Sequence, residues 1–248
     1  MNALIGTYAL LATTCGAIFT TSLDAHEFII KPAALHAKAG DKIPFSVLPT
    51  HVFMSGEELL PAKSVNVSLF EGNKSVDLRL RENNILQTLD GSATLQTKGT
   101  AIIASHLLEP IETMNSQETG RPQKVRFEKF SKALIVVDTA DKNYEKVLAH
   151  RLEIVPVSDP AAARVGDELA FKILFEDKPL QAYVYATCDG FSRHYNTYAY
   201  ATESRDGIAH VKVTRPGVWM VRVEQRTRAN IKDYDLLSLK ATFVFSVQ

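Results

Sequence analysis

The sequence has almost no cysteine, and this absence excludes two classes of structure. Its 248 residues include only two cysteines, Cys15 and Cys188. Cys15 lies in an apolar leader that we expect to be removed, so Cys188 would be the only cysteine of the mature chain. An intramolecular disulfide and a cysteine-rich metal site are then both excluded, and stability has to come from the hydrophobic core.

An excess of charge and the common catalytic motifs are lacking as well. The 28 basic and 28 acidic side chains balance to a formal net charge of zero, which argues against nucleic acid or an anionic membrane surface as a partner. The sequence contains no Gly-x-Ser-x-Gly elbow, no phosphate-binding loop and no His-Glu-x-x-His motif. These motifs would indicate a hydrolase, a nucleotide-binding protein or a metalloprotease. We therefore predict that the chain is not an enzyme.

The first residues of the chain are typical of a secretory signal peptide. Residues 1–20 contain no charged side chain and are followed by a small, polar run that ends at Ala25. This order of an apolar region and a small-residue cleavage site predicts export. We expect a signal peptide at residues 1–25 and a periplasmic location for the remainder. Cleavage after Ser22 or Leu23, and an uncut membrane anchor, are the alternatives.

Beyond the leader, short runs of β-branched and aromatic residues dominate, and no stretch has a long helical period. Several runs alternate apolar and polar side chains, as strands with one buried face do. Turn signals occur at residues 71–74, at Asp90-Gly91 and at residues 205–207. The pattern predicts an all-β protein with strands at residues 28–30, 45–48, 65–70, 76–80, 101–104, 132–137, 182–186, 208–213, 218–223 and 241–247.

An internal repeat divides the chain into two similar halves. Residues 39–48 (AGDKIPFSVL) are similar to residues 165–174 (VGDELAFKIL). Each segment has a Gly-Asp turn followed by alternating apolar residues, which commonly opens an immunoglobulin-like sandwich domain. We therefore expect two immunoglobulin-like β-sandwich domains in tandem, at residues 26–155 and 156–248, with prolines stiffening the joint between them.

The sequence also allows predictions for several individual segments and aromatic residues. Residues 109–124 are polar and are interrupted by glycine and proline, so they are expected to form a loop or lid. The basic, alternating residues 121–132 are expected to form a strand with a solvated face rather than a nucleic-acid patch. Trp219 is predicted to anchor the core. Alternation also predicts cross-strand packing, in preference to sugar binding, for the tyrosines at 195, 198 and 200.

Two histidines and an acidic residue form the candidate metal site. Cleavage after Ala25 would make His26 the first residue, and its amine and imidazole can both be unprotonated near neutral pH. Together they would chelate a borderline metal ion. His51 follows a predicted strand and precedes a polar run, a place from which a side chain can face a cleft. His26, His51 and Glu57 are the predicted metal ligands, with Glu58 as the alternative oxygen donor; a strand start and a solvated face are the competing interpretations.

For the remaining histidines the sequence gives less reason to expect metal binding. His194 lies in an aromatic, polar loop, and it either reaches a site shared by the two halves or is an exposed loop residue, the interpretation we favour. His106 is expected to pack at a strand end. The other three, His36, His150 and His210, are expected at the surface.

Several motifs resemble those of a known family. They are Ala25–Phe28 (AHEF), the Gly-Asp turn with its following strand, and His51–Glu57 (HVFMSGE), and in the second half residues 152–156, 165–169, 185–187 and 216–221. The chain is similar at these positions to a bacterial periplasmic family of unknown function that is labelled NikM-like and linked to nickel and cobalt uptake. The resemblance covers nearly all of the expected mature chain.

The resemblance implies that the chain binds a divalent transition metal, Ni(II) or Co(II). Copper bound by the two histidines is the alternative that the donor atoms allow. An inner- or outer-membrane metal transporter would be its partner. A second hypothesis, from a different class, is a non-catalytic protein-interaction or carbohydrate-binding module that uses sheet edges and residues 109–124. The variant His26→Ala separates the two hypotheses, since it should abolish metal binding only under the first.

Overall fold

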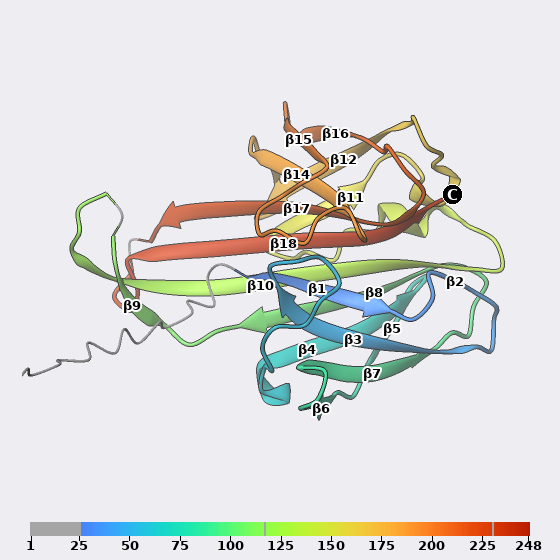
Figure 1. Ribbon diagram of the computed structural model, residues 1–248, viewed down its shortest axis with the longest axis horizontal. Helices are drawn as coiled ribbons and strands as arrows, with labels where there is room; N and C mark the ends of the chain where they lie inside the picture. The colour runs from blue at the N-terminus through green and yellow to red at the C-terminus, as the bar shows by residue number, and fades with distance from the viewer. Residues whose placement is uncertain (1–25, 117, 230) are drawn as a thin grey trace, which may run out of the picture.

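The computed structural model describes residues 26–116, 118–229 and 231–248 (Figure 1). Within these residues there is no α-helix, and short 3-10 helices at Ala62–Ser64, Lys142–Glu145 and Pro160–Ala162 accompany the strands. No helix in these ranges is long and apolar enough to cross a membrane. The predicted all-β fold class is confirmed. The predicted signal peptide, residues 1–25, lies outside the described residues.

A ten-stranded sheet runs through both halves of the molecule. Its strand order is β15-β14-β17-β18-β10-β8-β4-β5, and β2 and β9 also pair with β10. The strands are β2 (His36–Ala37), β4 (Val65–Glu71), β5 (Lys74–Asp77), β8 (Gly99–Leu108), β9 (Glu112–Asn115), β10 (Pro122–Val137), β14 (Tyr183–Cys188), β15 (Tyr200–Glu203), β17 (Gly217–Arg228) and β18 (Leu236–Val247).

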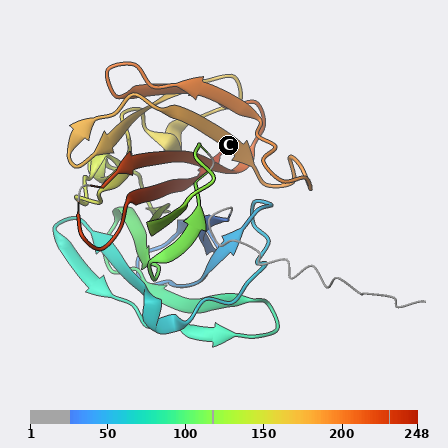
Figure 2. The same cartoon turned by 90° about the vertical axis from the view of Figure 1, so that its left-hand side faces the viewer.

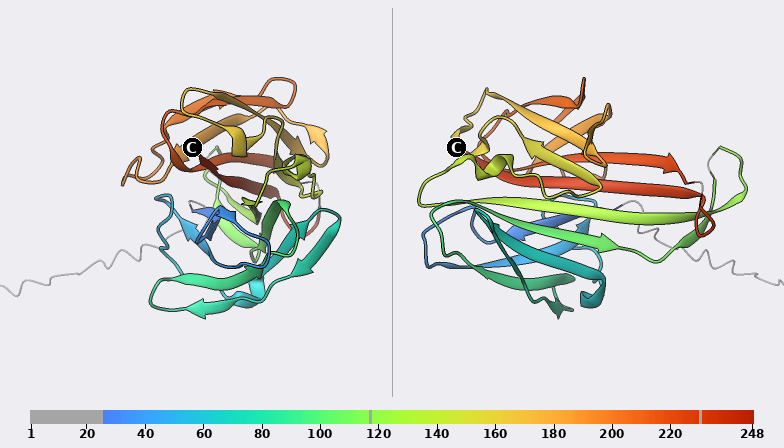
Figure 3. Two further views of the ribbon diagram at one scale, coloured as in Figure 1. Left: turned by 90° about the vertical axis from the view of Figure 1, so that its right-hand side faces the viewer. Right: turned by 180° about the vertical axis from the view of Figure 1, so that it is seen from behind.

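Two four-stranded sheets, one from each half, cover this central sheet. The first has the order β1-β3-β7-β6, with β1 (Glu27–Pro32), β3 (Lys42–Thr50), β6 (Arg81–Asn83) and β7 (Thr88–Thr94). The second joins β11 (Leu152–Pro156), β12 (Glu168–Phe175) and β13 (Lys178–Pro179), with β16 (Ile208–Lys212) paired to β12. In Figures 1, 2 and 3 the blue β1 and β3 lie on one side of the long green β10 and red β18, and the yellow β11 and β12 lie on the other.

Each outer sheet encloses a hydrophobic core with one face of the central sheet. Strand β10 shows this clearly, because its side chains alternate between the two cores. Leu134 and Val136 belong to the core of the second half, while Ala133, Ile135 and Val137 belong to the core of the first half. A strand places successive side chains on opposite faces, so β10 contributes to both cores at once.

The two halves are joined by hydrogen bonds between strands. β10, from the first half, pairs in parallel with β18, from the second, from Val125↔Leu236 to Ala133↔Val244. The predicted boundary between residues 155 and 156 falls inside β11, the first strand of the second outer sheet. The division into two domains stays a prediction, since a shared sheet neither requires nor forbids it.

The internal repeat has the same local structure in both halves. Gly40 and Gly166 have φ angles of +96° and +99°, a region that favours glycine. Each following aspartate accepts a hydrogen bond from the backbone N–H three residues before it, Asp41 from Lys38 at 2.8 Å and Asp167 from Arg164 at 2.9 Å. The turns lead into β3 and β12, which occupy corresponding places in the outer sheets.

One expectation for the first half was wrong, and two were only partly right. Asp90-Gly91 is not a turn but lies within β7, where Gly91 pairs with Phe45; a Cβ at Gly91 would lie 2.5 Å from that ring, so glycine here allows close packing. Residues 109–124 are not one long loop, because residues 112–115 form β9 and residues 122–124 begin β10, and these two strands pair. Residues 121–132 do form a strand, but its lysines Lys129 and Lys132 are buried and paired with glutamates instead of solvated.

Expectations for the aromatic residues had mixed outcomes. Trp219 is fully buried in the core of the second half, and its indole N–H donates to the carbonyl of Arg215 at 2.9 Å, so its predicted role is confirmed. Tyr195 and Tyr198 do not alternate along a strand. They lie in the loop between β14 and β15, and only Tyr200 is in a strand.

Candidate metal site

The pairing of β1 with β3 brings the two predicted histidines together. The strands are antiparallel, and Glu27 at the start of β1 is opposite Thr50 at the end of β3. His26 precedes β1 and His51 follows β3, so the two residues extend this register by one position. Their ring centroids are 3.8 Å apart and their planes are inclined by 46°.

A tight loop after β3 returns Glu57 to the same place. The Thr50 hydroxyl donates to the carbonyl of Val52, and the N–H of Ser55 donates to that carbonyl as well, at 3.0 Å. Glu57 Oε1 then accepts the backbone N–H groups of His51 at 2.9 Å and Val52 at 3.2 Å. The carboxylate therefore closes the loop on itself, and its second oxygen points at the imidazoles.

The second oxygen of Glu57 faces both rings. Glu57 Oε2 lies 2.5 Å from Nδ1 of His51 and 3.6 Å from Nε2 of His26. One ligand atom from each of the three residues can be chosen so that all lie within 4.8 Å of one another. The Nδ1 atom of His26 is buried and has no hydrogen-bond partner among the described residues. Such a buried polar atom is costly unless something binds it.

Electrostatics favour neutral His26 and charged Glu57. Burial, with smaller contributions from His51 and Lys129, lowers the pKa of His26 to about 4. Burial would raise the pKa of Glu57, but hydrogen bonds from the His51 ring and from the loop backbone outweigh it and hold this pKa below its usual range. At neutral pH the site therefore offers an unprotonated imidazole and a negative carboxylate.

The second half of the chain provides a wall of the site. The ring of Tyr195, in the loop of residues 189–199 between β14 and β15, lies 4.7 Å from the His51 ring. The Tyr198 hydroxyl donates to Glu27 Oε1 at 3.4 Å, and Arg222 on β17 forms an ion pair with the same oxygen at 2.7 Å. Burial and the nearby Glu27 charge raise the pKa of Tyr198 to about 12, so its hydroxyl stays protonated.

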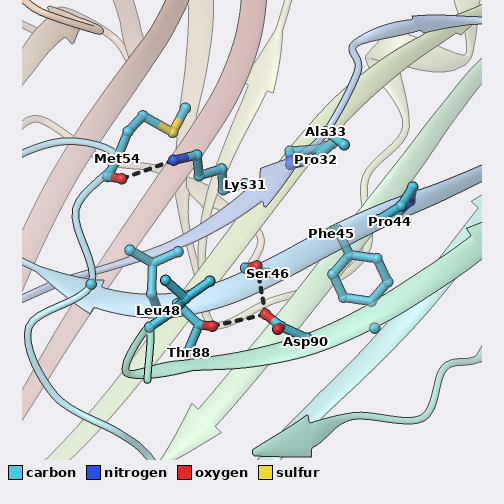
Figure 4. Close-up of a pocket in the computed structure, with 13 residues that line it drawn as sticks. Lys31, Pro32, Ala33, Pro44, Phe45, Ser46, Leu48, Met54, Thr88 and Asp90 are labelled. Atoms are coloured by element: carbon cyan, nitrogen blue, oxygen red, sulfur yellow. Dashed lines mark hydrogen bonds between the residues drawn. The ribbon is translucent and has the colours of Figure 1, made fainter. Parts of the chain in front are cut away.

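Two hollows flank the loop after β3. One, of about 20 Å³, lies between the halves and is lined by Glu27, Thr50 and His51 on one side and by Ser192, His194 and Thr197 on the other. The second is larger, about 430 Å³, and its lining includes Phe45, Met54 and Asp90 (Figure 4). There Lys31 donates to the Met54 carbonyl at 3.0 Å. The larger hollow contains none of the three clustered residues.

The structure thus gathers the three predicted residues in one place. Glu58, the alternative oxygen donor, is not in the cluster, and His194 lines the adjoining cavity without belonging to it. Sequence reasoning missed Tyr195 and Arg222. Tyr195 was interpreted as part of an alternating strand, and Arg222 has no signal that distinguishes it from other strand arginines.

The other histidines lie outside the cluster, and two of them pack on a phenylalanine ring. His106 and His150 stack on Phe130, with ring centroids 4.7 and 5.0 Å from it. His150 was expected at the surface but is half-buried. Burial, Lys132 and His106 lower its pKa to about 3. His36 and His210 are exposed, as expected.

Comparison with known proteins places the chain in a family without defining its activity. The model of the family described as "Domain of unknown function (DUF4198)" matches residues 23–227. No curated protein matches the chain.

Solved structures with some similarity include several adhesin domains. The D0–D1 domain of intimin is 13% identical and covers 87% of this chain and 96% of its own, with a TM-score of 0.24. The Escherichia coli adhesin FdeC is 12% identical, with coverages of 87% and 64% and a TM-score of 0.27. The Yersinia pseudotuberculosis adhesin InvE is 12% identical, with coverages of 90% and 59% and a TM-score of 0.26. At these TM-scores the similarities carry no argument about function.

Proposed function

The chain belongs to the family described as a domain of unknown function (DUF4198), so its activity has to be inferred from the site. We propose that it binds one divalent transition metal ion through His26 and His51, with Glu57 beside the two rings. The protein would act in the periplasm as a non-catalytic accessory to metal uptake, beside a membrane transporter. The observation that carries this proposal is the convergence of two imidazoles and one carboxylate within 4.8 Å.

The contacts of Glu57 indicate which ring nitrogens are available to a metal. An ionised carboxylate only accepts hydrogen bonds, so His51 donates from Nδ1 and keeps a lone pair on Nε2. His26 turns Nε2 toward the same carboxylate oxygen, which leaves its unpartnered Nδ1. In this arrangement the metal takes His26 Nδ1 and His51 Nε2, while Glu57 orients both rings and supplies negative charge, as carboxylates behind histidine ligands commonly do.

The proposed signal cleavage would add a third nitrogen. A cut after Ala25 leaves the α-amino group of His26 as the new N-terminus, and this amine and Nδ1 of the same residue can close a chelate ring on one ion. An α-amino group titrates near 8, so a metal ion can displace its proton at neutral pH. The unpartnered Nδ1 supports this chelate, because it is the ring nitrogen nearer to the backbone.

The donor set narrows the choice of metal. Imidazole and amine nitrogens suit Ni(II), Co(II), Cu(II) and Zn(II), and they do not suit Mg(II) or Ca(II). The resemblance to NikM-like proteins favours nickel or cobalt. Copper binds most N-donor sites more tightly than either metal does, so the physiological metal has to be identified from protein isolated from the periplasm.

Native mass spectrometry of protein purified without chelator tests the proposal. We expect a mass that begins at His26 with one bound metal ion. Calorimetric titration of chelator-treated protein with Ni(II), Co(II), Cu(II) or Zn(II) should then give one site, which His26→Ala and His51→Ala should abolish. His36→Ala is the matched control, because His36 is exposed and its ring contacts Ser246 rather than a residue of the cluster.

The opposite result would favour the second hypothesis. If neither the isolated protein nor the titrated protein binds any of the four metals, the cluster is a hydrogen-bonded corner of the fold. The chain would then be an interaction or carbohydrate-binding module whose partner lies elsewhere on its sheets.

A further inference from the structure

The loop of residues 189–199 brings another imidazole next to the proposed metal site. His194, together with Ser192 and Thr197, lines the cavity of about 20 Å³ whose opposite wall includes Glu27 and His51. A cavity of this size admits a single water-sized occupant. It lies between a histidine of the first half and a histidine of the second.

The loop already contacts the site through the residue that follows His194. Tyr195 packs on the His51 ring at 4.7 Å although 64% of its surface is exposed to solvent. Figure 1 shows the orange connection between β14 and β15 extending toward the loop after β3. The backbone beside His194 is therefore held at the site even though the imidazole itself is exposed.

Both ends of this loop are anchored in the fold, and between them the loop meets the first half through the Tyr195 ring. Near the start, Phe191 packs against the core of the second half and lies 5.4 Å from the guanidinium of Arg215. Near the end, Tyr198 donates to Glu27. Between them, residues 193–197 are exposed, and the N–H of His194 donates only locally, to Ser192 Oγ at 2.9 Å. The side chains of residues 193–197 belong to neither hydrophobic core.

The proposed site has room for a further donor. Borderline metals commonly take four ligands at about 2.0–2.1 Å for nitrogen. His26 and His51 supply two imidazoles, and the amine would make three nitrogens. At least one coordination position is then open, and His194 is the histidine of the second half that lines the adjoining cavity.

We propose that His194 is an additional nitrogen ligand, drawn onto the ion by the loop of residues 189–199 when metal binds. This inference rests on the proposed function and extends it, because it makes the site composite. The first half provides His26 and His51, the second half provides His194, and the ion links the two. Metal binding would then order a loop of the second half as well as fill a site in the first.

The test compares His194→Ala with His210→Ala in the full chain, with Ni(II) and Cu(II) as probes. His210 is the matched control because it is an exposed histidine on β16 that pairs with Glu168 at 3.1 Å. Loss of a residue that only orients a ligand typically weakens metal binding by about 10–100-fold, so loss of a direct ligand should weaken it by at least as much. Pulsed EPR of the Cu(II) protein should count three imidazoles in the wild type and two in His194→Ala. Hydrogen exchange should show metal-dependent protection of residues 193–197 that the variant lacks.

The outcomes separate this inference from the proposed function. If His26→Ala and His51→Ala lose the metal but His194→Ala keeps wild-type affinity and imidazole count, His194 is not a ligand and the proposed function stands. If the wild type binds neither probe metal, and neither Co(II) nor Zn(II), both proposals are wrong. Because His194 is exposed, its removal should not impair folding, and an unchanged urea unfolding curve would verify this.

Discussion

The substitution Glu57→Gln tests how the carboxylate supports the proposed site. Glutamine has nearly the same shape as glutamate, and its carbonyl oxygen can still accept the backbone N–H groups of His51 and Val52 that Oε1 accepts now. The loop after β3 should therefore keep its conformation. What changes is the atom that faces the imidazoles, from a negative acceptor to an N–H donor.

This exchange alters the chemistry of His51. In the wild type, His51 donates from Nδ1 to Glu57 Oε2 at 2.5 Å and keeps its Nε2 lone pair. An amide N–H at the same place needs an acceptor, so Nδ1 has to give up its proton, which moves to Nε2. The nitrogen proposed to bind metal is then protonated. The loss of the negative charge 3.6 Å from the His26 ring weakens the attraction for a cation further.

We expect Glu57→Gln to weaken metal binding by about 10–100-fold, which corresponds to about 1.4–2.7 kcal/mol. The side chain of Glu57 is 24% exposed, so the free energy of unfolding of the metal-free protein should change by less than about 1 kcal/mol. Calorimetric titration measures the first quantity and urea unfolding the second. Glu58→Gln is the matched control, since Glu58 lies next in sequence but outside the cluster. Equal affinities for Glu57→Gln and the wild type would refute the role given to Glu57.

Three further predictions concern the scaffold around the site. In Gly56→Ala the new Cβ would meet a carbonyl oxygen of the β6–β7 turn at 2.7 Å, so the loop should shift, displace the adjacent Glu57 and weaken metal binding by about 10-fold in the same titration. Glu153→Gln should leave Lys132 buried without its ion pair, and urea unfolding should show a free energy of unfolding lower by about 3–5 kcal/mol. The double variant Lys132→Met with Glu153→Leu should restore most of this loss. A loss below about 1 kcal/mol in the single variant would argue against a buried ion pair. Because the pKa of His150 is low, the unfolded chain takes up its proton near pH 6.5 and the folded chain only near pH 3, so the free energy of unfolding falls as the pH falls through this window. Between pH 7 and 4.5, His150→Asn should lose about 2 kcal/mol less of this free energy than the wild type. Equal losses in the two proteins would show that the ring is solvated in the folded state.

Local pattern predicted the strands and the candidate residues well, because these properties are encoded over a few neighbouring positions. The repeat at Gly40 and Gly166 is an example, since a Gly-Asp turn and its following apolar alternation specify both the left-handed glycine and the strand. The histidines were found in the same way, from a position at a strand end. Nothing local specified that Glu27 pairs with Thr50, the register that places His26 beside His51.

Properties that depend on distant parts of the chain were missed. The parallel pairing of β10 with β18 joins residues more than a hundred positions apart, and no short pattern encodes it. It also explains the error over Lys129 and Lys132. Alternating charge in a strand usually indicates a solvated face, but a sheet with an outer sheet on each side has little solvated face at its centre. The two lysines are therefore buried and depend on Glu109 and Glu153.

The shared sheet also determines where the metal site can form. β1 is fixed by its pairing with β3 and by the buried side chains of Phe28, Ile29 and Ile30. Polar groups of the central sheet hold its backbone as well. The Thr242 hydroxyl on β18 donates to the carbonyl of Phe28 at 2.6 Å, and Ser131 Oγ on β10 accepts the N–H of Ile30 at 3.0 Å. These two hydroxyls also contact each other at 2.9 Å. Strands from both halves thus hold the segment that begins with His26, and the loop of residues 189–199 packs on His51 from the other side. An ion at this point would sit at the junction of the two halves, so its binding would be a property of the whole chain and would report on how the halves are joined.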